Sequence, residues 1–138
     1  MIFKILGVPK PKQSMKFTKK GFSYQPKEVK EQERNLKYDI RSQLPEGHIP
    51  YDGPLQLSVT FVFPPPAGWS KAKMGLLQMG TKFYKDTKPD LQDNLMKGVC
   101  DAMEGIVYTN DSRICKLTGS EKIYGLVPQT IIKIEPLT

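Results

Sequence analysis

The sequence predicts a small α+β domain with a mixed or antiparallel sheet and two main helices. The chain has 138 residues, a common length for one domain, and shows no internal repeat or low-complexity linker. Residues 55–63 alternate between apolar and polar side chains, which is typical of a strand. Residues 26–44 and 90–104 instead place apolar side chains at helical spacing. We therefore expect residues 1–138 to form a single domain.

The first half of the chain predicts a strand, a basic loop and a long helix. Residues 1–8 are mostly apolar and form the strand, and a Lys-rich stretch follows. Pro26 suits the first turn of a helix, which should end near Leu44. The buried stripe of this helix consists of Val29, Leu36, Ile40 and Leu44.

The second half begins with the clearest strand. The core side of residues 55–63 consists of Leu55, Leu57, Val59, Phe61 and Phe63. A proline-rich loop follows and contains a short helix over residues 70–79. Trp69 in this loop either anchors the loop, which we favour, or stacks on a base. Residues 114–125 and 130–137 are expected to form two further strands.

The charge distribution favours a polyanionic partner. Lys and Arg number 21 against 14 Asp and Glu, a formal net charge of +7. A basic protein with a concentrated acidic patch suits a nucleic acid that is cut at a metal-dependent centre. The alternative is a basic protein that binds nucleic acid nonspecifically or only gains solubility from its charge.

Several classes of protein and site are excluded by what the sequence lacks. No stretch is long and apolar enough for a membrane span or signal peptide, so we expect a cytosolic (cytoplasmic) protein with no membrane partner. Cys100 and Cys115 are too few and too widely spaced for a zinc site, and we interpret them as semi-buried thiols. His48 is the only histidine, which argues against histidine-based catalysis. Any metal should be a hard cation, and we expect no small-molecule cofactor.

Ten basic residues are candidate DNA contacts. They are Lys16, Lys19 and Lys20 in the first loop, Lys30, Arg34, Lys37 and Arg41 along the first helix, and Lys71, Lys73 and Lys88 before the second. Phe17, Phe22 and Tyr24 lie among the loop lysines and either stack on bases or pack on the sheet edge. The helical stripe is equally consistent with a solvated surface.

Residues 88–112 contain the strongest chemical signal, a set of ionisable residues on one helical face. At about 100° per residue, five of them fall within a sector of about 80°. They are Asp90, Asp93, Lys97, Asp101 and Glu104. The opposite side is apolar and consists of Leu95, Met96, Val99, Ala102 and Met103. Asp111 follows after a short apolar connection and could return to the same site.

The crowded carboxylates predict a metal site that processes phosphate. Like charges repel unless a cation lies among them, and Mg²⁺ prefers one or two carboxylates together with phosphate oxygens and water. Two structural alternatives remain open. Asp90 or Asp93 could cap the helix, and Asp93 and Lys97 could form an ordinary exposed ion pair. Neither alternative explains the other carboxylates.

The same residues carry a resemblance to the RusA family of Holliday-junction resolvases. The run KPDLQDN, followed by Leu95, Lys97, Asp101, Ala102, Gly105 and the residues Asn110 to Ser112, resembles the family signature KPDxDNLxKxxxDAxxG with DDS after it. GVPKPKQSMKF and YQPK resemble the basic N-terminal segment of the family, and WSKAK resembles its loop before the helix. The likeness therefore covers most of the chain.

The resemblance implies a RusA-like fold and a homodimeric, Mg²⁺-dependent endonuclease that nicks four-way DNA junctions symmetrically, with Mn²⁺ as a possible substitute. By position, it makes Asp90, Asp93 and Asp111 the metal ligands and Lys97 the catalytic lysine. The family usually has one residue between its first two aspartates, whereas this chain has two. Asp93 keeps the family register, so the extra residue either is absorbed with Asp90 still a ligand or aims Asp90 away.

Asp101 and Glu104 are expected to lie outside the metal's ligand set, because Mg²⁺ rarely uses so many protein ligands. The prediction for the whole chain is therefore a nuclease acting on branched DNA. Two alternatives remain: a relative that cuts branched DNA other than four-way junctions, and a non-catalytic basic nucleic-acid-binding protein in which the altered aspartate spacing has abolished cleavage.

Overall fold

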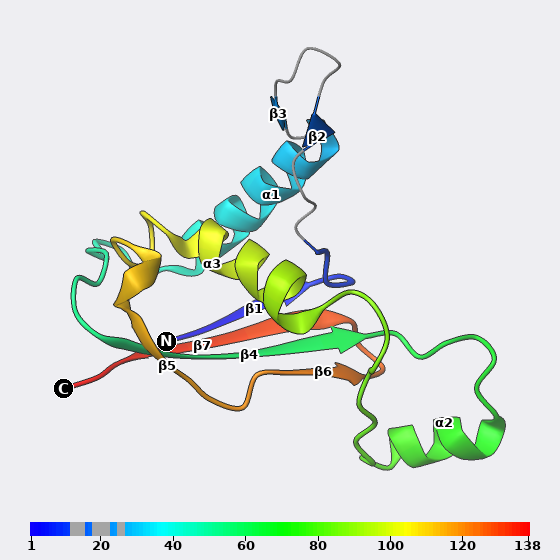
Figure 1. Ribbon diagram of the computed structural model, residues 1–138. Coiled ribbons are helices and arrows are strands. Elements are labelled where there is room, and N and C mark those ends of the chain that lie inside the picture. Colours follow the sequence, from blue (N-terminus) through cyan, green and yellow to red (C-terminus); the bar gives the residue numbers. More distant parts are fainter. Residues whose placement is uncertain (12–15, 18–22, 25–26) are drawn as a thin grey trace.

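The computed structural model describes residues 1–11, 16–17, 23–24 and 27–138. In these residues a five-stranded sheet has the order β1-β7-β4-β5, and β6 also pairs with β4. Two helices, α1 and α3, lie on one face of the sheet, while the short helix α2 lies beyond one of its ends (Figure 1). The predicted α+β class is confirmed. No helix among the described residues combines the length and apolarity needed to cross a bilayer.

The elements follow the predicted order closely. The strands are β1 (Ile2–Leu6), β2 (Lys16–Phe17), β3 (Ser23–Tyr24), β4 (Leu55–Phe63), β5 (Ile114–Leu117), β6 (Glu121–Tyr124) and β7 (Gln129–Pro136). The helices are α1 (Lys27–Gln43), α2 (Lys71–Gln78), the π-helix η1 (Leu91–Met96), α3 (Lys97–Met103) and the 3₁₀ turn η2 (Asp111–Arg113).

The central strand β4 makes the sheet mixed. It pairs antiparallel with β7 and parallel with both β5 and β6. The prediction of one strand over residues 114–125 is wrong, because Gly119 adopts a φ of 56° and turns the chain between β5 and β6. Ser120 makes up for the interrupted pairing, since its Oγ accepts a hydrogen bond from the backbone N of Val59 at 3.1 Å.

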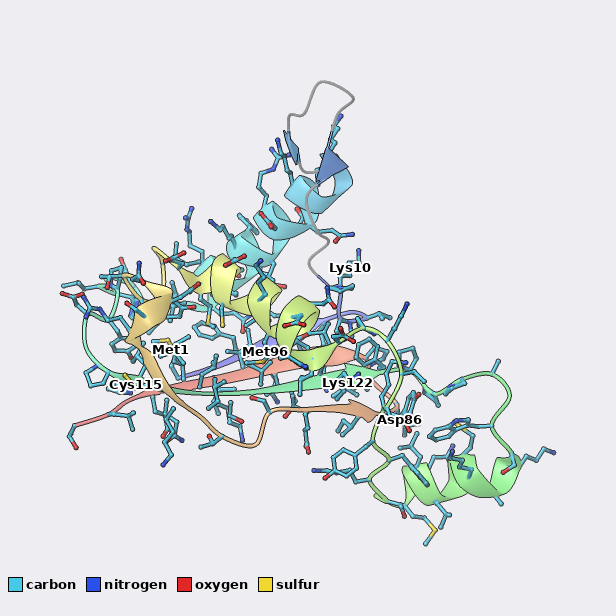
Figure 2. The ribbon with its side chains drawn as sticks, in the orientation of Figure 1. Met1, Lys10, Asp86, Met96, Cys115 and Lys122 are labelled. Carbon is cyan, nitrogen blue, oxygen red and sulfur yellow. The ribbon has the colours of Figure 1, made fainter. Side chains whose placement is uncertain are left out.

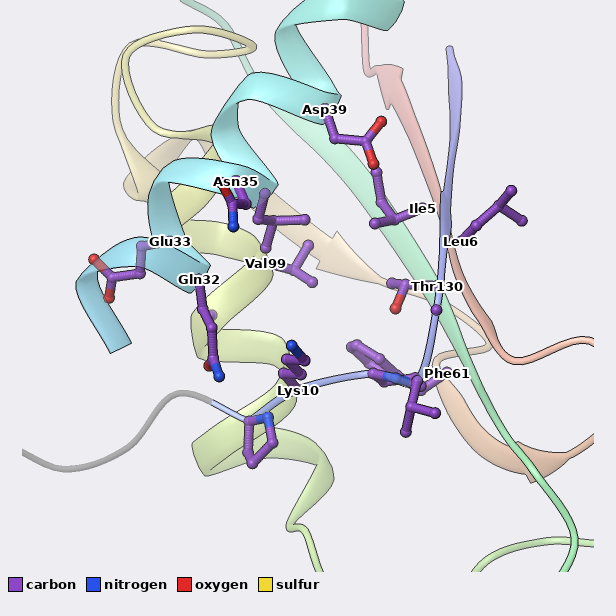
Figure 3. A pocket seen from close by; sticks show the side chains of 16 residues that line it. Ile5, Leu6, Lys10, Gln32, Glu33, Asn35, Asp39, Phe61, Val99 and Thr130 are labelled. Carbon is purple, nitrogen blue, oxygen red and sulfur yellow. The ribbon is translucent and has the colours of Figure 1, made fainter. Parts of the chain in front are cut away.

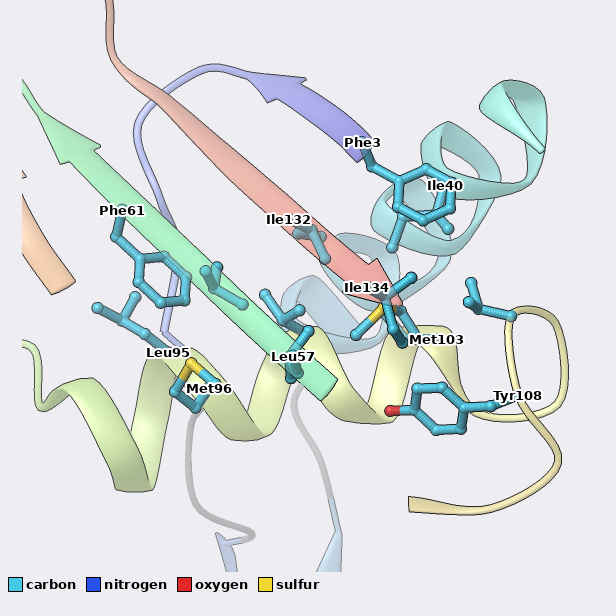
Figure 4. Packing of buried hydrophobic residues seen from close by; sticks show 14 of the residues in the cluster. Phe3, Ile40, Leu57, Phe61, Leu95, Met96, Met103, Tyr108, Ile132 and Ile134 are labelled. Atoms are coloured by element: carbon cyan, nitrogen blue, oxygen red, sulfur yellow. The ribbon is translucent and has the colours of Figure 1, made fainter. Parts of the chain in front are cut away.

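The core lies between the sheet and the two helices (Figure 4). All five predicted core residues of β4 are buried, as is the apolar side of the acidic helix, including Leu95, Val99 and Met103. Each large side chain of this kind contributes about 2 kcal/mol when it leaves water. Because its apolar side faces the core, the helix presents its ionisable residues outward.

Helix α1 packs on α3 and on the edge strand β1. Ile40 is fully buried, whereas Leu36 and Leu44 are half-buried and the side chain of Val29 lies outside the described part of the chain. The amide of Gln43 pairs with the backbone of Lys4, accepting from its N and donating to its O, both at 3.0 Å. This contact occupies peptide groups that an edge strand would otherwise expose.

The loop around α2 is attached to the sheet through aromatic residues. Trp69 lies edge-on to Phe83 and to Tyr124, with ring centroids 5.1 and 5.0 Å away. Next to it, Ser70 caps α2 by accepting a hydrogen bond from Lys73 N at 3.1 Å. Trp69 is therefore a loop anchor, as predicted.

Candidate metal centre

The acidic helix begins with a π turn rather than an α turn. The backbone N of Leu95 donates to Asp90 O at 3.1 Å, five residues back, and η1 covers Leu91–Met96. A π turn holds one more residue than an α turn. It therefore accommodates the extra residue between Asp90 and Asp93 while Leu95 and Met96 stay buried. The prediction of a regular α-helix is wrong for this first turn only.

The side chains of Asp90 and Asp93 are exposed at the start of this helix. Asp90 is the N-cap residue by backbone position, but its carboxylate makes no capping hydrogen bond. Within the described part of the chain, no hydrogen bond or ion pair involves the side chain of Asp90, Asp93 or Lys97. Neither the capping alternative nor an Asp93 to Lys97 ion pair is therefore supported.

A tight turn after α3 brings Asp111 back alongside the helix. Gly105 has a φ of 86°, a conformation that favours glycine, and its N donates to Tyr108 O at 2.7 Å. One ligand atom from each of Asp101, Glu104 and Asp111 lies within 4.8 Å of the others, and all three residues are half-buried. The backbone N of Asp111 also donates to Glu104 Oε1 at 3.3 Å. These three residues are called the acidic triad below.

Tyr108 contacts Asp111 of the acidic triad from the core side. Its side chain is fully buried, and its hydroxyl lies 2.8 Å from Asp111 Oδ1 and 2.7 Å from Cys100 O. Burial is the main reason that the pKa of Tyr108 lies far above its usual value. Burial, together with the charge of Asp111, raises the pKa of the Cys100 thiol to about 11. Both groups therefore stay protonated at neutral pH, and Tyr108 remains a hydrogen-bond donor.

The turn that carries Asp111 is also fixed from the opposite side. Backbone hydrogen bonds of 2.9 Å join Tyr51 to Val107 and to Thr109. Asp52 accepts from Thr109 Oγ1 at 2.8 Å and pairs with Arg113 at 2.8 Å. The hydrogen bond from Thr109, followed by the charge of Arg113, lowers the pKa of Asp52. Asp111 thus lies on a turn that is held at both ends.

The structure separates the predicted ligands into two groups. Asp111 lies with Asp101 and Glu104, and among the described residues no group of three such side chains includes Asp90 or Asp93. Asp93 precedes Asp101 by eight residues, roughly 12 Å along a helix axis at about 1.5 Å per residue. Oxygens that share one Mg²⁺ lie within about 4 Å of each other, because each metal–oxygen distance is about 2.0–2.1 Å. Lys97 is exposed and lies one turn from each of Asp93 and Asp101.

That Asp101 and Glu104 lie outside the metal's ligand set stays a prediction, although the structure places both beside Asp111, and sequence reasoning missed Tyr108. Asp101 and Glu104 are three residues apart on one helical face and directly precede a glycine turn, a signal that could have paired them with Asp111. Tyr108 lies in an apolar connection and carries no such signal. The triad offers only carboxylate oxygens, a donor set that suits Mg²⁺ or Mn²⁺.

The predicted DNA contacts remain predictions. Lys30, Arg34 and Arg41 on α1 are exposed and Lys37 is half-buried, whereas Lys71 and Lys88 are exposed and Lys73 Nζ lies 4.1 Å from the centroid of the Trp69 ring. The side chains of Lys16, Lys19, Lys20, Phe17, Phe22 and Tyr24 lie outside the described part of the chain.

The two thiols differ in exposure, and the histidine has a structural part. Cys100 is half-buried as predicted, but Cys115 is exposed, so that part of the prediction is wrong. His48 Nε2 lies 3.1 Å from Val107 O, and its ring lies edge-on to Tyr51. His48 therefore supports the turn that leads to Asp111.

A cavity of about 470 Å³ lies between the end of β1, α1 and α3 (Figure 3). Its lining includes Lys10, Asn35, Asp39, Phe61 and Thr130. No member of the acidic triad lines it, nor do Asp90, Asp93 or Lys97. The cavity is therefore separate from the candidate metal centre.

Comparison with known proteins identifies a family. The family model described as Endodeoxyribonuclease RusA matches residues 7–135, nearly the whole chain. The matched region contains the π turn, the acidic triad and the turn that carries Asp111. No curated protein matches the chain.

Proposed function

Since the chain belongs to the RusA endodeoxyribonuclease family, we propose that it is a Mg²⁺-dependent enzyme that resolves four-way DNA junctions by paired symmetric nicks. The observation that supports the chemistry is the return of Asp111 to the polar side of the acidic helix, where it meets two further carboxylates. Like charges in such proximity favour a bound cation. The net charge of +7 favours a polyanionic substrate.

Each residue of the proposed site would have its own role in cleavage. A bound Mg²⁺, or Mn²⁺ in its place, would activate a water molecule and stabilise charge on the phosphate. Asp111 would hold the cation, with Asp101 or Glu104 beside it. Lys97 would supply a fixed positive charge to the scissile phosphate. Tyr108 would keep the Asp111 carboxylate oriented through its hydroxyl.

We further propose that each site is shared between two protomers of a homodimer. In one chain the Asp90 and Asp93 end of the helix lies well away from Asp111, so all three predicted ligands meet only if a second chain brings its own helix start to the first chain's triad. Two equivalent sites related by a two-fold axis match the two scissile phosphates of a junction. Apolar side chains of the terminal strands, such as Ile2 and Leu6, which are 57 % and 75 % exposed, are available for such an interface.

A nicking assay on a synthetic four-way junction tests the proposed activity. Linear duplex and single-stranded DNA of the same sequence serve as controls, with Mg²⁺ present or removed by a chelator. Paired nicks on the junction alone, only with Mg²⁺, support junction resolution. Equal nicking of flaps or forks indicates a nuclease for other branched DNA. Binding without nicking at any Mg²⁺ or Mn²⁺ concentration contradicts the enzyme and favours a non-catalytic binding protein.

Light scattering at micromolar concentration tests the dimer. A mass of about twice 15.7 kDa supports it. A monomeric mass, both free and with junction DNA, contradicts the shared site.

A further inference from the structure

Lys122 on β6 contacts the segment that leads into the acidic helix (Figure 2). Its Nζ donates to the carbonyl oxygen of Thr87 at 2.7 Å and to that of Pro89 at 2.8 Å. Asp90 directly follows Pro89 and is the N-cap residue of η1. A side chain more than 30 residues further along the chain therefore holds the backbone at the entrance to the candidate site.

The same segment pairs with β6 just before this contact. Tyr124 N donates to Phe83 O, and Lys85 N donates to Lys122 O, both at 3.0 Å. This pairing of backbones ends after Lys85. Beyond this point the ammonium group of Lys122 donates to the carbonyl oxygens of Thr87 and Pro89, which do not pair with the backbone of β6. Charged donors make stronger hydrogen bonds than neutral ones.

We propose that Lys122 is a positioning residue for Asp90, and that it holds this carboxylate where the metal and the scissile phosphate bind. The inference rests on the proposed function, in which Asp90 of one protomer reaches the acidic triad of the second protomer. The Asp90 side chain makes no capping hydrogen bond, so the backbone at Pro89 sets its position. That backbone is what Lys122 holds.

Lys82 provides a matched control. It is bonded to Glu121 on the same strand at 2.7 Å, and no hydrogen bond or ion pair joins its side chain to residues 87–90 of the described chain. Lys82→Met therefore removes one nearby positive charge and one short ion pair without removing a side-chain contact to residues 87–90. Lys122→Met removes the charge and both carbonyl contacts, while Lys122→Arg keeps the charge and the capacity to donate.

The first measurement is calorimetric titration of the DNA-free protein with Mn²⁺. Loss of a residue that orients a ligand typically weakens metal binding about 10-fold to 100-fold. We expect at least a 10-fold weakening for Lys122→Met, recovery towards wild type for Lys122→Arg, and no change for Lys82→Met. The second measurement is amide hydrogen exchange, in which Lys122→Met should speed exchange in residues 87–95 only. In the nicking assay the Mg²⁺ concentration for half-maximal rate should rise in parallel.

Wild-type Mn²⁺ affinity and wild-type exchange in Lys122→Met would overturn the inference. An equal loss in Lys82→Met would do the same, because the effect would then come from charge alone. If Lys122→Met does not fold, Lys122→Gln keeps most of the side chain and is judged by the same two measurements. A wild-type protein that neither binds Mn²⁺ nor nicks a junction contradicts the proposed function, whereas normal wild-type binding with an unchanged variant contradicts only the role of Lys122.

Discussion

The hydroxyl oxygen of Tyr108 lies 2.8 Å from Oδ1 of Asp111 and 2.7 Å from the carbonyl oxygen of Cys100. A phenol has one proton, so this hydroxyl donates to one acceptor or shares its proton between both. Because burial keeps Tyr108 protonated, the link between the Asp111 turn and α3 persists across the neutral pH range. The orientation of a candidate metal ligand thus depends on a fully buried side chain.

Tyr108→Phe should weaken metal binding with a small loss of stability. The ring still fills the core, so the free energy of unfolding should fall by only about 1 kcal/mol. The Asp111 carboxylate loses its orienting donor, so Mn²⁺ binding should weaken by about 10-fold. Calorimetry and thermal melting measure the two effects separately. Unchanged Mn²⁺ affinity would show that Tyr108 serves the fold alone.

Asp93→Asn and Asp111→Asn should each abolish nicking of a four-way junction while junction binding stays intact or becomes tighter. Each change removes a negative charge, which weakens metal binding but not the attraction for phosphate. Gel-shift titration without metal measures binding, and a nicking assay with Mg²⁺ measures activity. Asp86→Asn is the control, since Asp86 is exposed and lies outside both acidic groups. Near-wild-type turnover of either test variant contradicts the metal assignment.

Mixing the Asp93→Asn and Asp111→Asn proteins should restore nicking if each site is shared between protomers. A mixed dimer then contains one site with both changes and one with neither, so an equal mixture should recover about a quarter of wild-type nicking, and only as single nicks. Neither protein alone should show activity. If no nicking returns although mass spectrometry detects the mixed dimer, each site forms within one chain.

Lys97→Ala should lower turnover by about 100-fold or more without loss of stability. The side chain is exposed and makes no hydrogen bond or ion pair with the described residues, and removal of a charge that stabilises a transition state typically costs this much. Single-turnover nicking gives the rate and thermal melting gives the stability. Lys116→Ala, an exposed lysine of β5, is the control. Unfolding or an unchanged rate would assign Lys97 a structural role.

The two thiols should react with a thiol reagent at very different rates. Cys115 is exposed, whereas Cys100 is half-buried with a pKa of about 11 against an ordinary 9.0, which lowers its thiolate fraction about 100-fold near neutral pH. The rate at Cys100 should rise about tenfold per pH unit until the pH approaches 11. Cys115→Ser leaves Cys100 as the reporter. Fast labelling of Cys100 at pH 7 would contradict its burial.

Segments with a clear periodic pattern of apolar residues were predicted correctly, both as elements and in their buried side. The alternation of residues 55–63 matches β4, and the apolar side of residues 90–104 is buried. These patterns report burial directly, because one face of each element must leave water. The single strand predicted over residues 114–125 failed because its break depends on one positive φ at Gly119, which apolar periodicity does not register.

The candidate site was only partly predictable for a similar reason. Local spacing placed Asp101 and Glu104 on one face, but their meeting with Asp111 depends on a turn that is held by Tyr51, which is distant in sequence, as well as by the nearby Tyr108. Lys122 likewise lies 33 to 35 residues from the residues that it contacts, and no local pattern connects them. Contacts between distant segments are set by the tertiary fold.

The π turn at the start of the acidic helix makes the spacing of Asp90 and Asp93 independent of the packing of the core. The backbone N of Leu95 donates to the carbonyl oxygen of Asp90, five residues back, so the turn takes up an extra residue at its exposed end. The residues that follow keep their helical register, and Leu95, Val99 and Met103 stay buried. A one-residue insertion or deletion at Leu91 and Gln92 can therefore occur without repacking the interior. Relatives of this chain should vary in the spacing of their first two aspartates, and a search that demands one fixed spacing will overlook some of them.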